Sequence, residues 1–235
     1  MKKYIKYKDI EVTYTEELHG GGTRFGQQFI PIVKEEFGHV DHVFEFCAGP
    51  GFIGFSLLAN GLCDTLTLAD INPAAVAICN ETIKNNRLES KVATYLSDGL
   101  VSIPETEKWD LVVSNPPHVF TTDETQYEKD KILYDPNFRI HRKFYQDIKK
   151  FLKPTGSVLF QEHTESTNVE DFRQMIEENG PRIIDVFSFT PSTNQKPVSF
   201  LRKALNPKRV YKFFKRRLFP PPPVRNYYFI WCKLK

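Results

Sequence analysis

Short apolar runs alternate along the middle of the chain with segments whose apolar residues recur at helical spacing, and this alternation limits the range of folds most. Strands are expected at His42–Cys47, Thr65–Ala69, Val92–Leu96, Trp109–Ser114, Ser157–Gln161, Ile183–Phe189 and Tyr227–Lys233. Helices are expected at Phe52–Asn60, from Pro73 onward, at Phe138–Leu152 and at Val169–Glu178. Strands that alternate with helices form βαβ units around a mostly parallel sheet. The pattern therefore predicts an α/β fold with a seven-stranded, mostly parallel sheet and helices on both faces.

Two segments fall outside this alternation. Residues 1–41 precede the first core strand, and we expect them to form a short hairpin and a helix over Gly26–Phe37 that lie on the sheet. Residues 190–226 separate the last two strands by far more than the usual loop length, which indicates a functional or mobile segment. With 235 residues, the chain is predicted to be one domain (1–235) with an N-terminal extension and a basic insert.

The composition is that of an ordinary water-soluble protein, with 40% hydrophobic and 26% charged residues. No apolar run reaches the roughly 18 residues that a membrane-spanning helix needs, and no apolar signal-peptide region follows the N-terminal lysines. We therefore expect a cytoplasmic protein. The four cysteines lack the spacing of a metal site and have apolar neighbours, so we expect reduced, buried thiols and no metal at Cys47, Cys63, Cys79 and Cys232.

The first core strand runs into a glycine-rich loop in which Gly49, Gly51 and Gly54 are spaced as G-x-G-x-x-G. Glycines at this spacing allow a tight turn and a close approach of the backbone to a ligand at a helix N-terminus. Asp70 lies at the end of the next strand, where a carboxylate can accept hydrogen bonds from both hydroxyls of a ribose. The loop therefore predicts a site for a nucleotide-containing cofactor; a tight turn with Asp70 as a helix N-cap is the alternative.

NAD and S-adenosylmethionine both bind to loops of this type, and three details favour S-adenosylmethionine. Glu45 stands four residues before the first glycine, where a carboxylate would repel the pyrophosphate of NAD. Asp98 and Gly99 follow the third strand, where a carboxylate can accept a hydrogen bond from the adenine amine. The third detail is the end of the fourth strand, which reads Asn115-Pro116-Pro117-His118.

This Asn-Pro-Pro-His segment is the most informative feature of the sequence. Two prolines stiffen the backbone and remove two N–H donors, which leaves the Pro116 carbonyl beside the side-chain oxygen of Asn115. Two converging acceptors suit an –NH₂ group, because they bind both hydrogens and stabilise the positive charge that grows on nitrogen during attack. The carboxyl end of a strand is also where open α/β sheets bind ligands. An Asx turn that starts the Pro-Pro bend is the alternative interpretation of Asn115.

Together these motifs resemble the class I S-adenosylmethionine-dependent amino-methyltransferases that carry an (Asn/Asp/Ser)-Pro-Pro-aromatic motif, a group with protein-glutamine, adenine-N6, cytosine-N4 and guanine-N2 members. The resemblance covers about residues 23–165. It implies a Rossmann-like sheet whose last strand is antiparallel and inserted beside the sixth, with S-adenosylmethionine as cofactor and direct methyl transfer to nitrogen. It also implies that Thr23–Gly26 lie over the methionine end of the cofactor. The expected cofactor-binding residues are Thr23, Glu45, Gly49, Gly51, Asp70, Ile71, Asp98, Gly99 and Asn115, and the expected catalytic residues are Asn115, Pro116 and His118.

The sequence departs from the family pattern at two points. His118 replaces the usual aromatic residue; an imidazole can stack on a planar substrate, accept a proton or cap the loop after the prolines. A separate N-terminal substrate domain, which release-factor glutamine methyltransferases carry, is not expected. The amine- or amide-bearing substrate is therefore left open among a small molecule, a protein side chain and an RNA or DNA base. An NAD-dependent oxidoreductase and a non-catalytic RNA- or partner-binding module on a methyltransferase scaffold are the alternative functions.

Charge is distributed unevenly along the chain. Twelve Lys or Arg residues and no Asp or Glu follow Asp185, whereas residues 1–185 hold 20 cations against all 29 anions. Eight of the twelve lie in Arg202–Arg217, interleaved with aromatic residues. Such a segment can bind RNA by its phosphates and bases, bind an anionic membrane surface, or form a solvated helix or substrate lid. RNA or another anionic partner at Arg202–Arg217 is therefore one of the open hypotheses.

The sequence also predicts the positions of four further side chains. His141 and Arg142 lie on the helix expected at Phe138–Leu152 and are expected at the surface. Glu162 and His163 follow the fifth strand and could face the substrate cleft. The sequence makes no prediction of the oligomeric state.

Overall fold

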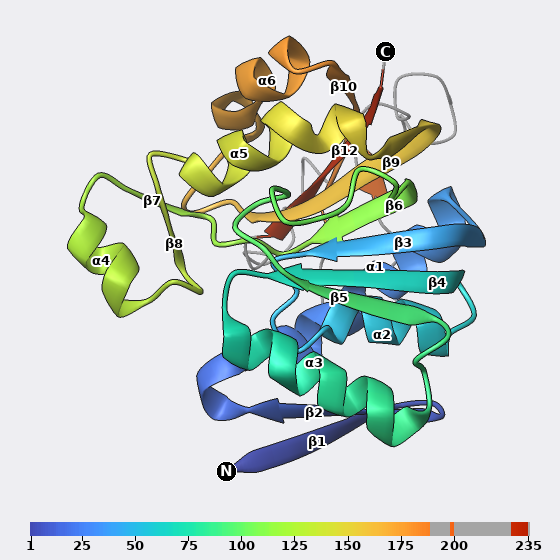
Figure 1. Ribbon diagram of the computed structural model, residues 1–235. Helices are drawn as coiled ribbons and strands as arrows, with labels where there is room; N and C mark the ends of the chain where they lie inside the picture. Colours follow the sequence, from blue (N-terminus) through green and yellow to red (C-terminus); the bar gives the residue numbers. More distant parts are fainter. Residues whose placement is uncertain (189–197, 200–226, 235) are drawn as a thin grey trace, which may run out of the picture.

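The computed structural model describes residues 1–188, 198–199 and 227–234. Within these ranges, one sheet forms the centre of the molecule, in the order β11-β10-β12-β9-β6-β3-β4-β5 (Figure 1). Its strands are β3 (Val40–Phe46), β4 (Cys63–Asp70), β5 (Val92–Leu96), β6 (Trp109–Ser114), β9 (Leu152–His163), β10 (Pro181–Ser188), β11 (Val198–Ser199) and β12 (Tyr227–Leu234).

The pairing of these strands confirms the expected sheet. Strands β3, β4, β5, β6 and β9 pair in parallel, and β12 is antiparallel to both of its neighbours, β9 and β10. The last strand is thus inserted beside the sixth, as the resemblance implied. The sequence pattern did not predict the two-residue β11, which extends the edge beside β10.

Helices cover both faces of the sheet, because successive strand residues point to opposite sides. Val43 packs in a core with α1 (Gly22–Glu36), α2 (Phe52–Ala59) and α3 (Pro73–Asn86), and the adjacent Phe44 packs in a second core with α5 (Arg139–Asp147) and α6 (Val169–Glu178). Figure 1 shows α5 and α6 on one side of the sheet and α1, α2 and α3 on the other. Asn72 caps α3 by accepting a hydrogen bond from Ala74 N, and Pro73 occupies the first helical position as expected.

Two helices differ from their expected bounds by more than one residue. The helix α1 begins at Gly22, four residues before the expected Gly26. The helix α5 ends at Asp147, and a 3₁₀ turn, η2 (Ile148–Lys150), follows it. Strand β9 then begins at Leu152, five residues before the expected Ser157. The expected helix to Leu152 was therefore too long and the expected fifth strand too short.

The N-terminal hairpin lies on helices rather than on the sheet. It consists of β1 (Lys2–Tyr7) and β2 (Ile10–Thr15), and η1 (Glu16–Leu18) follows it. Thr13 N donates to Thr82 Oγ1 of α3 over 3.0 Å, and the hairpin forms an outer layer beside α2 and α3 (Figure 1). The expected position on the sheet is wrong for the hairpin, whereas α1 does reach the sheet, where Phe29 contacts Phe229 of β12.

An unpredicted excursion, residues 119–136, follows β6 and is called the flap below. It contains β7 (Val119–Thr121), α4 (Glu124–Lys129) and β8 (Tyr134–Pro136), with β7 and β8 paired in parallel. Figure 1 shows the flap projecting beyond the sheet at the ends of the strands.

The structure also bears on the expectations for membrane-spanning helices and for the cysteines. No helix in the described ranges is long and apolar enough to cross a membrane, and the cytoplasmic location stays a prediction. All four cysteines are free; Cys47 is half-buried and the other three are buried. The basic segment Arg202–Arg217 lies outside the described residues, and the division into extension, domain and insert stays a prediction.

Candidate active site

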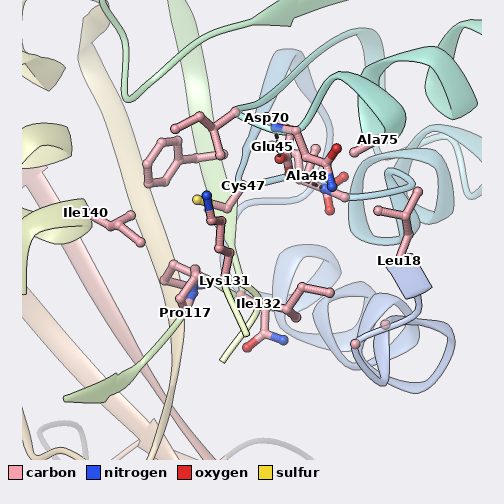
Figure 2. Close-up of a pocket in the computed structure, with 18 of the residues that line it drawn as sticks. Leu18, Glu45, Cys47, Ala48, Asp70, Ala75, Pro117, Lys131, Ile132 and Ile140 are labelled. Carbon is pink, nitrogen blue, oxygen red and sulfur yellow. Dashed lines mark hydrogen bonds between the residues drawn. The ribbon is translucent and has the colours of Figure 1, made fainter. Parts of the chain in front are cut away.

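A cavity of about 820 Å³ opens at the carboxyl ends of the parallel strands, between the glycine loop and the flap (Figure 2). It brings together most of the residues that the sequence singled out. Thr23 and Gly51 do not line the cavity, although Thr23 hydrogen bonds through Oγ1 to His19, which does. The predicted site residues that line it are Glu45, Gly49, Asp70, Ile71, Asp98, Gly99, Asn115, Pro116 and His118.

Glu45 fixes the shape of the glycine loop. Its buried carboxylate accepts hydrogen bonds from the N–H groups of Ile53, over 3.2 Å, and Gly54, over 2.6 Å, at the start of α2. Burial raises the pKa of Glu45 to about 8, although these two hydrogen bonds act in the opposite direction. A Cβ at Gly54 would lie 2.8 Å from Glu45 Oε2, so only glycine leaves room for the carboxylate. Glu45 therefore holds the loop in place from beneath.

Gly51 acts through backbone conformation. It is the N-cap of α2 at φ 78°, in the left-handed region that favours glycine. A Cβ at this position would also lie 2.7 Å from the ring of Phe55. The second glycine of the motif thus permits the turn, and its predicted role in cofactor binding would be indirect.

Asp70 and Asp98 face the cavity from neighbouring strand ends. Asp70 Oδ2 accepts from Gly49 N over 2.7 Å and Oδ1 accepts from Asn72 N over 2.8 Å, which orients the carboxylate at the end of β4. Asp98 is half-exposed and pairs with Lys143 of α5 over 2.5 Å. Lys143 also lines the cavity, but a lone lysine on an amphipathic helix gave no signal in the sequence.

The side-chain oxygen of Asn115 is a buried acceptor that finds no hydrogen-bond partner in the described part of the chain. Asn115 directly follows Ser114, the last residue of β6. The Ser114 Oγ donates a 2.6 Å hydrogen bond to Phe46 O and so fixes this end of β6 to β3. A buried acceptor without a donor costs about 1–3 kcal/mol. A ligand N–H group would remove this penalty, so the residue fits an amine- or amide-bearing substrate.

The ring of His118 lies in an aromatic cluster at the same end of the cavity. It stacks on His163 with 5.6 Å between ring centroids and contacts Tyr227 of β12 edge-on at 6.3 Å. Burial, with smaller contributions from His163 and His141, lowers the pKa of His118 to about 4, so the imidazole is neutral at neutral pH. Its Nδ1 is buried without a partner in the described ranges. Tyr227 lines the cavity and was missed by the sequence analysis.

The expectations for His141 and for Glu162 are wrong. His141 is only 1% exposed, although its helix pattern placed it at the surface; Arg142 is exposed as expected. Helix α5 begins at Arg139 after two residues in the left-handed region, and this start turns His141 inward. Glu162 belongs to β9 and is fully buried, so it does not face the cleft. His163 also does not line the cavity, but it supports His118 from behind.

The flap supplies the remaining wall of the cavity. Figure 2 shows Lys131 and Ile132 of the flap beside Pro117, facing the glycine loop. Gly20, at φ 47°, has no room for a side chain, because a Cβ there would lie 2.9 Å from Ile132 Cγ2. The flap thus meets the loop before α1, and the two segments together cover part of the cavity.

Comparison with known proteins agrees with this geometry. The methyltransferase small domain family model matches residues 25–166. A release factor glutamine methyltransferase of Leptospira interrogans is 33% identical over 112 residues, which cover 47% of this chain and 38% of that protein. A ribosomal protein uL3 glutamine methyltransferase of Francisella tularensis is 29% identical over 143 residues, which cover 57% of this chain and 45% of that protein. The chain therefore spans less than half the length of these relatives.

A solved structure shows the same fold. The M. jannaschii TYW2 in complex with AdoMet has a TM-score of 0.56 and 15% identity to this chain, and the match covers 100% of this chain and 87% of that one. The family match takes in the glycine loop, Asp70 and Asn115, all of which meet at the cavity. S-adenosylmethionine is accordingly the cofactor, and the NAD alternative is set aside. The chain belongs to the methyltransferase small domain family, whose fold is that of the class I S-adenosylmethionine-dependent methyltransferases.

Proposed function

We propose that the chain transfers the methyl group of S-adenosylmethionine to a nitrogen atom held by Asn115 and the carbonyl of Pro116. The observation that carries this proposal is the buried Asn115 Oδ1, on the cavity wall, which has no donor in the described ranges. An –NH₂ group brings two donors to this point. Two acceptors would bind both hydrogens and stabilise the positive charge that develops on nitrogen.

S-adenosylmethionine supplies a methyl group that is already activated on a sulfonium, so the task of the protein is to position the acceptor nitrogen. Glu45 and Gly51 shape the loop that would hold the cofactor, and Asp70 and Asp98 offer it carboxylates. His118 is a weak base, because its pKa of about 4 lies well below neutral pH. Its contribution is therefore to stack on a planar acceptor rather than to remove a proton.

The acceptor that we favour is the side-chain amide of a protein glutamine. An amide is planar, carries an –NH₂ group and suits both the neutral ring of His118 and the acceptor of Asn115. The names of the two relatives, which act on a release factor and on ribosomal protein uL3, support the same substrate class.

A base in RNA is the second candidate. Eight cations lie in Arg202–Arg217, interleaved with aromatic residues, and this composition suits a phosphate backbone. Tyr227, the first described residue after 200–226, lines the cavity. A non-catalytic module is disfavoured, because Asn115, Pro116 and most of the predicted cofactor-binding residues line one cavity.

A methyl-transfer assay with labelled S-adenosylmethionine tests the proposal against protein, RNA and small-molecule fractions. The wild-type chain should label the protein fraction. Asn115→Ala should bind the cofactor within about twofold of wild type but lose about 10²–10³-fold in turnover, by analogy with the loss of one transition-state hydrogen bond. Asn179→Ala, which removes a capping hydrogen bond on α6 far from the cavity, serves as the matched control. A near-wild-type single-turnover rate in Asn115→Ala would show that the motif is only structural.

A further inference from the structure

Behind the cavity, three charged side chains from three elements form a buried cluster that the proposed reaction does not use. His141 of α5 lies between Asp135 of β8 and Glu162 of β9, with Nδ1 2.6 Å from Asp135 Oδ2 and Nε2 3.0 Å from Glu162 Oε1. All three side chains are at most 1% exposed, and none lines the cavity. Removal of one member of such a cluster leaves a buried charge uncompensated, so the three are expected to act as a unit.

The arrangement fixes the protonation of His141. Burial disfavours the imidazolium, but the charges and hydrogen bonds of Glu162 and Asp135 outweigh it and raise the pKa of His141 to about 10. A protonated imidazole donates from both nitrogens, whereas a neutral one donates from one nitrogen only. His141 can therefore bridge both carboxylates at neutral pH.

The cluster joins the flap to the sheet. Asp135 is the middle residue of β8, in register with Phe120 of β7, so it belongs to the returning end of the flap. Glu162 lies near the end of β9, whose Phe160 is in register with Ser114 of β6. Strand β6 ends at Ser114 and continues into the Asn-Pro-Pro-His segment, whereas β9 continues in the sheet to Glu162, which pairs with Tyr228 of β12. The bridge therefore connects the flap to the strand next to the acceptor site.

The turn between Asp135 and His141 is strained. Asn137 and Phe138 have φ values of 51° and 54°, in the left-handed region, which asparagine tolerates but phenylalanine disfavours. Such a conformation persists only where the surroundings enforce it. The Asp135 carboxylate does so by accepting hydrogen bonds from Ile140 N over 2.9 Å and from His141 N over 3.3 Å.

We infer that Asp135, His141 and Glu162 form a clamp that holds the flap against the cavity, so that flap residues such as Tyr127, Lys131 and Ile132 complete its wall. The three are positioning residues, because they act on the reaction only through the flap. The inference rests on the proposed function in one respect: the flap is taken to contact the methyl acceptor.

Hydrogen exchange of the full chain tests the clamp without any substrate. Glu162→Gln keeps the shape of the side chain, lies outside the flap and removes the charge that holds His141. It should speed amide exchange in residues 119–136 by about tenfold or more. Asp135→Asn removes the charge at the flap end of the cluster and should speed exchange in the same residues. In the double variant, exchange should be only slightly faster than in the faster single variant, because both changes break the same cluster. In a transfer assay, kcat/KM of each single variant should fall by about 10–100-fold. The fold-change in the Kd for S-adenosylmethionine should be at least about tenfold smaller than this fold-change in kcat/KM.

Gln161→Met is the matched control. Gln161 precedes Glu162, is equally buried and donates a 2.6 Å hydrogen bond to Gln28 on the other side of the sheet. This variant should lower the melting temperature but leave exchange in the flap at the wild-type rate. Wild-type flap exchange in a folded Glu162→Gln protein would overturn the clamp, as would exchange raised equally throughout the sheet. If Glu162→Gln does not fold, amide exchange in the flap is compared between His141→Gln and wild type instead, with the same expected result. A wild-type chain that methylates no amide would refute the proposed function, whereas the exchange data would still decide on the clamp.

Discussion

The backbone N–H of Gly49 donates a 2.7 Å hydrogen bond to Oδ2 of Asp70, which joins the first glycine of the loop to the carboxylate at the end of β4. Asn72 N orients the other oxygen of the same carboxylate. Each carboxylate oxygen can accept more than one hydrogen bond, so Asp70 can hold the loop and still accept from the hydroxyls of a ribose. The glycine motif and the acidic residue are therefore one structural unit.

Replacement of Asp70 by alanine should weaken cofactor binding. The variant loses the acceptors for the ribose and leaves Gly49 N–H without its partner, and a hydrogen bond to a charged group contributes about 1.5–3 kcal/mol. We expect the Kd for S-adenosylmethionine, measured by calorimetry, to rise by at least about tenfold. Asp64→Ala changes an exposed carboxylate at the start of the same strand and should leave the Kd unchanged. An unaltered Kd in a folded Asp70→Ala protein would contradict the placement of the cofactor.

The buried carboxyl of Glu45 should make stability depend on pH. Its folded-state pKa of about 8 lies above its ordinary value of 4.5, so its contribution to stability is fully present below about pH 4.5 and is lost as the pH rises through about 8. The free energy of unfolding of wild type minus that of Glu45→Gln should therefore fall between pH 5 and pH 8. Denaturant unfolding of both proteins measures this difference, and other titrating groups cancel from it. A difference that is flat or rises with pH would mean that the carboxylate is ionised in the folded state.

His118 should not titrate in the range in which the enzyme is assayed. With a pKa of about 4 it stays neutral between pH 6 and pH 8, so wild type and His118→Phe should give pH profiles of kcat/KM of the same shape in that range. His118→Ala loses the stacking ring and should lower kcat/KM by about 2- to 12-fold, the worth of about 0.5–1.5 kcal/mol for an aromatic pair. An apparent pKa near 6.5 that disappears in His118→Phe would instead identify the imidazole as a proton acceptor.

The basic segment distinguishes a nucleic-acid substrate from a protein or small-molecule substrate. If RNA is the substrate, binding should weaken with salt at a log–log slope of about −0.7 per phosphate contact on a single strand. Replacement of Lys212, Lys215, Arg216 and Arg217 by Gln should then flatten the slope by up to about 3 units. For a protein or small-molecule acceptor, the four replacements should leave the salt dependence nearly unchanged. A steep salt dependence that the four replacements abolish would favour RNA over a protein glutamine as the substrate.

The sequence was sufficient for the parts of the fold that follow from periodicity. Strands β5 and β6 and helix α6 have the expected bounds, because each is a continuous run with one period. The flap could not be predicted, since two three-residue strands and a six-residue helix are too short to show a period. The orientation of His141 was missed because it depends on where α5 starts, and the left-handed Phe138 sets that start.

Some residues of the candidate site could likewise be predicted from the sequence, and others could not. Residues that belong to a local motif, such as Glu45, Asp70 and Asn115, could be found because each stands at a recognisable place relative to a strand end. Lys143 and Tyr227 reach the cavity only through the packing of α5 and β12, and neither has a motif of its own. The supporting role of Glu45 could not be inferred either, because its hydrogen bonds to Ile53 and Gly54 exist only once the loop is folded.

The identity of the methylated atom tests the central claim most directly. Wild-type chain is incubated with S-adenosylmethionine that carries a ¹³C methyl group and with the amide-bearing protein fraction, and the product is located by mass spectrometry and NMR. The account predicts a methyl carbon bonded to nitrogen in the wild-type product and almost none in the product of Asn115→Ala, whose missing oxygen is the buried acceptor on the cavity wall. A methyl group on oxygen or carbon, or equal nitrogen methylation by Asn115→Ala, would contradict it.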